Sequence, residues 1–160
     1  MQLPKQYNSK KIEKRWQNYW EKNNIYKFNP KAKKIFSIDT PPPTVSGKMH
    51  MGHAFSYSQM DFIARYKRMQ GFSLFYPFGT DDNGLATERL IEQEKNVKAK
   101  NMDRQDFIKL CLTTLIPIRK KYIQDFKNIG LSCDFKIFYS TINPYCRKIS
   151  QKSFIKLYKL

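Results

Sequence analysis

The 160-residue sequence predicts an α/β fold with a mainly parallel sheet. Three short segments, at 34–40, 72–78 and 135–139, are rich in β-branched and aromatic residues and have the composition of strands. Segments with helical spacing of apolar residues surround them, in the order helix, strand, helix, strand, helix, helix, strand, helix. This alternation indicates βαβ units with right-handed crossovers. Ligands bind such sheets at the carboxyl ends of the strands.

The N-terminal elements are expected to be one helix and one strand. The helix runs from residue 9 to residue 22, with Ser9 as a plausible N-cap. Its apolar side chains share one face at i, i+4, i+7 and i+8: Ile12, Trp16, Tyr19 and Trp20. The strand at 34–40 then meets prolines at 41–43, which have no N–H to donate, so ladder pairing is expected to stop there.

The remaining elements follow from periodicity and from helix-end signals. A long helix is expected from 49 to 69, with Gly71 as its stop. The next segments, in chain order, are a strand at 72–78, a loop at 79–84, a helix at 85–94, a helix from Asp103 to before Gly130, a strand at 135–139 and a helix that begins at Asn143-Pro144. Pro117 predicts a kink or a break inside the longest of these helices.

The composition indicates a partner with negative charge. The formal net charge is +17 at pH 7, which fits nucleic acid or a membrane surface. The lysines are scattered and form no basic tail, so a lysine-rich solvated surface is the alternative.

Neither a membrane segment nor a disulfide framework is expected. No run of about 18 apolar residues occurs, and no apolar run follows residues 1–5 as a secretory signal would require. Cys111, Cys133 and Cys146 form no CxxC pair, which disfavours a structural zinc site and disulfide bonds. A reducing, cytoplasmic location is the resulting prediction.

Two histidines lie three residues apart, at His50 and His53, where the helix at 49–69 begins. Residues i and i+3 share a helix face, and a helix N-terminus favours phosphate through its free N–H groups and its dipole. Gly52 leaves room for a phosphate or a flat ring near the backbone. The pattern predicts a nucleotide-phosphate site; an ordinary polar surface and a metal site are the alternatives.

Acidic residues follow the second expected strand, at Asp81 and Asp82, with Asn83 next to them. Carboxylates at the carboxyl end of a strand could hold an ammonium group or a metal ion. The alternative is a capped turn, in which Asp and Asn side chains accept hydrogen bonds from the following helix.

These two loops resemble motifs of the class I aminoacyl-tRNA synthetases. Residues 41–53 read PPPTVSGKMHMGH, in which HMGH resembles the family's HIGH motif and PPPTVSG is similar to its valyl branch. Residues 79–88 read GTDDNGLATE, and the valyl branch places a GTD string there. Weaker similarity covers three further stretches, at 7–20, 128–135 and 149–154. The resemblance implies the first half of a Rossmann-like, parallel-sheet nucleotide-binding domain, preceded by an N-terminal helix.

The resemblance also implies roles for particular residues. His50 and His53 would be catalytic, because they would hold phosphate oxygens as pyrophosphate leaves. ATP would be bound by Thr44, Lys48, His50, Gly52 and His53, and the amino acid by Pro42, Thr44 and Asp81. Asp81 would bind the α-ammonium group. The roles of Asp82 and Asn83 stay open, because many bacterial relatives have His-Ala there.

The implied reaction is the activation of valine with Mg·ATP, followed by transfer of the valyl group to tRNA(Val). Mg²⁺ would enter with ATP, and neither a tightly bound cofactor nor a metal site of the protein is expected. A basic nucleic-acid-binding module without catalysis is the alternative from a different class. Another adenylyl-transferring enzyme of the same fold is a further rival, and it would need no tRNA.

The expected domain organisation is a helical extension at 1–33 and the HIGH-motif half of the catalytic domain at 34–160, which ends before the editing insertion. The family's second signature, KMSKS, does not occur in the sequence. Three explanations are open: a second chain that carries the KMSKS half and the editing domain, a truncated chain, or an inactive remnant.

Overall fold

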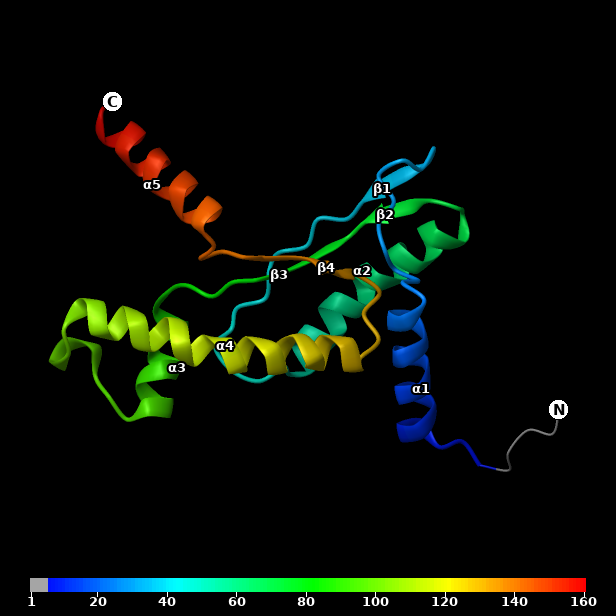
Figure 1. The fold of residues 1–160 in the computed structure, drawn as a ribbon, viewed down its shortest axis with the longest axis horizontal. Coiled ribbons are helices and arrows are strands. Elements are labelled where there is room, and N and C mark those ends of the chain that lie inside the picture. The colour runs from blue at the N-terminus through cyan, green and yellow to red at the C-terminus, as the bar shows by residue number, and fades with distance from the viewer. Residues whose placement is uncertain (1–5) are drawn as a thin grey trace.

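The computed structural model describes residues 6–160, and Figure 1 shows their arrangement. Residues 1–5, with which the expectation of no secretory signal begins, lie outside the described residues. The elements in chain order are α1 (Ser9–Lys22), β1 (Ile35–Ser37), α2 (Met51–Met69), β2 (Ser73–Phe75), β3 (Pro77–Thr80), α3 (Leu85–Lys95), a 3₁₀ turn η1 (Ala99–Asn101), α4 (Arg104–Asn128), β4 (Asp134–Ser140) and α5 (Pro144–Tyr158). Within these residues no helix is long and apolar enough to cross a membrane.

The strands pair in parallel, as predicted, but they form two short ladders. β1 pairs with β2, and β3 pairs with β4. The single strand predicted at 72–78 is therefore wrong: the chain changes partner at Tyr76, whose carbonyl accepts a hydrogen bond from the Asp134 N–H at 2.8 Å. Pro77 follows directly and has no N–H to continue a ladder. The loop predicted at 79–84 also begins later, because Gly79 and Thr80 belong to β3.

Three chain segments nevertheless run parallel and end at one edge. Beyond β1, an isolated parallel bridge pairs Thr44 with Asp81, one residue past the end of β3. On the other side of β3, Thr80 is in register with Ser140 at the end of β4. The carboxyl ends of all three segments therefore lie side by side, where ligands of parallel sheets bind.

The core lies between the central strands and the helices α2 and α4. Phe126 of α4 is fully buried and packs its ring against those of Tyr57, Phe78 and Tyr122, with centroids 4.9 to 5.2 Å apart. These contacts join α2, β3 and α4, so they hold the two candidate loops in one rigid body.

A buried polar cluster anchors the middle of α2 to the loop before β4. The carboxylate of Asp61 accepts from the Ser132 N–H at 2.8 Å and from the Arg65 Nε at 2.7 Å. Arg65 also donates to the carbonyl of Gly130. A buried carboxylate with these partners is satisfied, so the cluster fixes α2 relative to the strand that follows the loop.

The helix ends agree with the sequence in most places. Asp103 and Asn143 cap α4 and α5 as expected. The N-cap of α1 is Asn8, whose side chain accepts from the Lys11 N–H at 3.1 Å, so the assignment of Ser9 as the N-cap is wrong. The predicted break at Pro117 is also wrong, because α4 continues through it.

The last helix, α5, projects away from the rest of the molecule (Figure 1). Its side chains are exposed except for that of Cys146, which is half-buried. The packed body that holds the candidate site therefore ends near Asn143.

Replacing Gly79 with alanine is expected to destabilise the fold by about 1–3 kcal/mol, because a Cβ there would overlap the ring of Tyr139. Tyr139 is in register with Gly79 on β4 and covers it. Urea unfolding of Gly79→Ala and of the control Gly47→Ala measures the effect. A Cβ at Gly47 meets nothing within 4 Å, so equal unfolding midpoints for the two variants contradict the account.

Candidate active site

Asp81 lies at the shared edge of the sheet between two threonine hydroxyls. Thr141, directly after β4, donates to Asp81 Oδ1 at 3.0 Å. Thr44 donates to Asp81 Oδ2 at 3.4 Å. Both donors are neutral hydroxyls, and the carboxylate between them is half-buried. That is an arrangement suited to bind a small cation such as an ammonium group.

The backbone holds the two candidate loops together. The Val45 N–H donates to the Asp81 carbonyl, and the Asp81 N–H donates to the Pro43 carbonyl, both at 2.9 Å. The triproline segment thus accepts a ladder bond although it can donate none. The hydroxyl of Tyr57 on α2 donates to the Pro41 carbonyl, which ties the same segment to the helix. Pairing was expected to stop at the prolines, and the bridge after them shows that it resumes.

The two histidines form a capping box at the start of α2. His50 is the N-cap, and its Nδ1 accepts from the Gly52 N–H at 3.1 Å. The Nδ1 of His53 accepts from the His50 N–H at 3.4 Å. The ring centroids are 4.0 Å apart. A neutral imidazole that accepts at Nδ1 carries its proton at Nε2, so both rings are set as Nε2–H donors beside the positive end of the helix dipole.

His53 is also in contact with α4. Its Nε2 lies 3.3 Å from the hydroxyl of Tyr122, and the two rings meet edge to face. Partial burial and the neighbouring His50 lower the pKa of His53 below its ordinary value. Burial raises the pKa of Tyr122 to about 12. Both groups are therefore neutral at pH 7, and His53 acts as a hydrogen-bond donor and not as a cation.

Gly52 is needed by the cap itself. A Cβ at this position would lie 3.0 Å from Cε1 and 3.1 Å from Nδ1 of His50. The imidazole of His50 thus rests on the glycine in this structure. The sequence pattern predicts that Gly52 leaves room for a phosphate or a flat ring near the backbone, and that use of Gly52 stays a prediction.

Acidification is expected to destabilise the fold slightly through this cap. The pKa of His53 is depressed in the folded chain, so the unfolded chain binds the extra proton first, and stability falls as the pH drops below about 6.5. The loss should stay below about 1 kcal/mol, the value of a single helix cap. Urea unfolding at pH 7 and pH 5 tests this. His53→Gln keeps an acceptor at the capping-box position, and it should reduce the difference in unfolding free energy between pH 7 and pH 5. An equal difference in the variant and the wild-type chain would contradict the assignment of this pH dependence to His53.

The structure brings some of the predicted site residues together and leaves others apart. Thr44 meets Asp81, and His50 meets His53. Pro42, two residues before Thr44, is half-buried, and the side chain of Lys48 is exposed. Their roles in binding stay predictions.

Four residues near the site were missed by the sequence analysis: Arg119, Tyr122, Ser140 and Thr141. Tyr122 lies within the helix predicted from Asp103 to before Gly130, and its hydroxyl reaches His53. Ser140 and Thr141 follow directly after the predicted third strand, so the rule that ligands bind at strand ends could have found them. No local pattern marks Arg119, which reaches Asp82 at 3.1 Å from the middle of α4.

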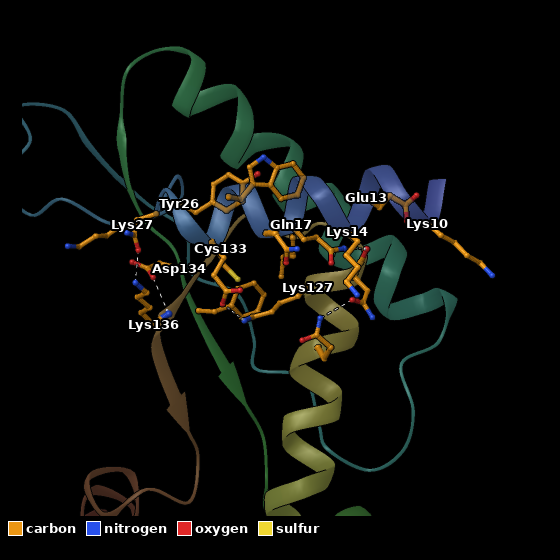
Figure 2. A pocket seen from close by; sticks show the side chains of 18 residues that line it. Lys10, Glu13, Lys14, Gln17, Tyr26, Lys27, Lys127, Cys133, Asp134 and Lys136 are labelled. Carbon is orange, nitrogen blue, oxygen red and sulfur yellow. Dashed lines mark hydrogen bonds and ion pairs between the residues drawn. The ribbon is translucent and has the colours of Figure 1, made fainter. Parts of the chain in front are cut away.

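A cavity of about 590 Å³ lies away from this edge, and Figure 2 shows the side chains that line it. It is lined by α1, the C-terminal turn of α4 and the beginning of β4, and thus opens near the amino ends of the strands. Lys10, Lys14 and Lys27 line it, while Lys127 is paired with Glu21 at 3.2 Å. None of the predicted site residues borders this cavity, so it adds nothing to the case for the site.

Comparison with known proteins shows which family this chain is similar to. A family model described as tRNA synthetases class I (I, L, M and V) matches residues 15–160. The valine–tRNA ligase of Rickettsia conorii is 51% identical over 158 residues, which cover 98% of this chain and 20% of that protein. The valine–tRNA ligase of Thermoplasma volcanium is 54% identical over 149 residues, which cover 92% of this chain and 19% of that protein.

A solved structure has the same fold. It is the ternary complex of Agrobacterium radiobacter K84 agnB2 LeuRS with tRNA and LeuAMS, at a TM-score of 0.76 and 24% identity. The similarity covers 96% of this chain and 18% of that chain. It confirms the predicted α/β class.

The chain belongs to the class I tRNA synthetase family whose members are grouped as I, L, M and V. Its resemblance to the valyl branch is confirmed by relatives that are valine–tRNA ligases and share 51% and 54% sequence identity with it. The chain spans about one fifth of the length of these curated relatives.

Proposed function

We propose that this chain forms the part of a valine–tRNA ligase that binds ATP and valine, and that it takes part in valine activation. The observation that carries the proposal is the pairing of Thr44 with Asp81 at the edge of the sheet. It joins the segment that leads to the start of α2, where His50 and His53 lie, with the loop that carries the Asp81 carboxylate. A nucleotide site and an ammonium site thereby become parts of one site.

In the proposed reaction, the carboxylate of valine attacks the α-phosphate of ATP, and pyrophosphate leaves. Mg²⁺ enters with ATP as part of the substrate. His50 and His53 donate from Nε2 to phosphate oxygens, on which negative charge builds up as the bond to pyrophosphate breaks. The N–H groups at the start of α2 add to this stabilisation. Lys48, two residues before the N-cap of α2, and Gly52, in the first turn of that helix, are the further proposed contacts to ATP.

Asp81 is proposed to hold the α-ammonium group of valine, while Pro42 and Thr44 line the side of the amino-acid pocket. A fixed ammonium group orients the carboxylate at the other side of the α-carbon for in-line attack. Positioning is the main contribution of these residues, because no covalent intermediate with the protein is required.

Transfer of the valyl group to tRNA(Val) is the proposed second step. It fits the net charge of +17, since tRNA is a polyanion. A second chain that carries the KMSKS signature and an editing domain is a proposed partner, and a cytoplasmic location belongs to the same proposal.

The proposal is tested by valine-dependent exchange of pyrophosphate into ATP, measured on the 160-residue chain with isoleucine and threonine as controls. Exchange with valine, and much less with isoleucine, is the expected result. Threonine is a near isostere of valine and is expected to be rejected only weakly, a limit for which valine–tRNA ligases are a standard example. A folded chain that neither exchanges nor binds a valyl-adenylate analogue contradicts the proposal.

The alternative of a basic nucleic-acid-binding module makes the opposite prediction for the histidines. Such a module would bind RNA through its lysines with a strong salt dependence. Its affinity would be unchanged when both imidazoles are removed. RNA binding without binding of any adenylate analogue would favour this alternative.

A further inference from the structure

Next to Asp81 lies a second carboxylate, that of Asp82, which the proposed reaction does not use. Its side chain is completely buried. Burying a carboxylate is costly unless it is paired and hydrogen-bonded. Oδ2 of Asp82 accepts from the hydroxyl of Thr80 at 3.0 Å and from the hydroxyl of Ser140, and lies 3.1 Å from Nη2 of Arg119.

These contacts join three elements at the site. Thr80 ends β3, Ser140 ends β4, and Arg119 comes from the middle of α4. Arg119 precedes Tyr122 by three residues, so both lie on one face of α4. That face therefore touches Asp82 with one side chain and His53 with the other.

A directed chain of hydrogen bonds leads from Asp82 to Asp81. The Asp82 N–H donates to the hydroxyl oxygen of Thr141 at 3.0 Å. Because that oxygen accepts from Asp82, the hydroxyl hydrogen of Thr141 is free to point at Asp81 Oδ1, also at 3.0 Å. The position of Asp82 thus sets the direction in which Thr141 donates.

We propose that Arg119, Asp82 and Thr141 form a positioning relay that fixes the Asp81 carboxylate for the α-ammonium group of the amino acid. The inference rests on the proposed function of Asp81. Thr44 alone holds the other oxygen of Asp81 weakly, at 3.4 Å. Without the relay the carboxylate would rotate, and the ammonium group would lose its oriented acceptor. Arg119 and Thr141 are positioning residues, because neither is required to touch the substrate.

The test compares two ligands of the 160-residue chain by calorimetry: valyl-sulfamoyl adenosine and its deamino analogue, which lacks only the ammonium group. Their affinity ratio isolates the contact with Asp81, and a general loss of stability would weaken both ligands alike. The wild-type chain is expected to prefer the amino form by about 10- to 100-fold, the effect of one charge-assisted hydrogen bond.

Four variants probe the relay. Thr141→Val keeps the shape and removes the hydroxyl, and Arg119→Met removes the charge from a residue that is about one quarter exposed. Both are expected to lower the preference by at least about fivefold, with little change for the deamino analogue. Thr141→Ser should restore most of the preference. The matched control Thr113→Val removes an exposed hydroxyl that bonds only within α4.

The outcomes separate the two proposals. If the wild-type chain prefers the amino form and Thr141→Val and Arg119→Met keep that preference, the relay is overturned while the role of Asp81 stands. If the folded wild-type chain binds both ligands equally or binds neither, the proposed function of Asp81 fails, and the relay fails with it. If Thr141→Ser loses the preference as Thr141→Val does, the hydroxyl is not the reason, and the relay is also overturned.

Discussion

His50→Asn and His53→Gln are each expected to slow valine activation by about 100- to 1000-fold, the usual loss when one donor to a developing charge is removed. Both substitutions keep the start of α2 intact. Asparagine is among the best N-cap residues, and glutamine at the third helical position completes a capping box. The imidazole Nε2–H is what each variant loses. Valine-dependent pyrophosphate exchange by the 160-residue chain measures the effect.

The control for these variants is a measurement of whether each one still folds. Circular dichroism and the urea midpoint should stay close to those of the wild-type chain, because the cap is preserved. Full exchange activity in either variant would show that its imidazole has no part in activation, and would favour the non-catalytic alternative.

Asp81→Asn is expected to raise the valine concentration needed for half-maximal exchange by about 10- to 100-fold. The amide has nearly the shape of the carboxylate, but it carries no charge to hold an ammonium group. The ATP concentration needed for half-maximal exchange should change much less, because His50 and His53 at the start of α2 are unaffected.

A matched control is Asp106→Asn, which removes an exposed carboxylate from the first turn of α4. It should leave both substrate requirements unchanged. A loss in Asp81→Asn that affects ATP and valine equally would instead indicate a damaged fold, and the assigned role of Asp81 would be wrong.

Much of the fold could be predicted because it depends on local patterns. The spacing of Trp16, Tyr19 and Trp20 indicated a helix in the segment that forms α1, and Asn143-Pro144 marked the start of α5. The split of the segment at 72–78 into β2 and β3 could not be predicted in this way. Its composition suits a strand, but the change of partner at Tyr76 depends on β4, whose first residue is Asp134.

In the candidate site, too, the residues in local motifs could be predicted and those brought in by long-range contacts could not. His50 and His53 were found because they lie in a short motif at the start of a helix, and Asp81 because it lies in a short motif that follows a strand. Arg119 and Thr141 reach the site over separations of 37 and 60 residues, counted from Asp82 and Asp81. The N-cap of α1 could not be predicted either: Asn8 and Ser9 are both good N-cap residues, and only the geometry decides between them.

The most direct test of the central claim is to map where the adenylate analogue binds. Amide resonances of the ¹⁵N-labelled chain would be followed by NMR during titration with valyl-sulfamoyl adenosine. The account predicts shifts concentrated at Thr44, Gly52, Asp81 and Asp82, at the carboxyl edge of the parallel segments. Shifts concentrated around the cavity between α1 and β4, or none at saturating analogue, would contradict it.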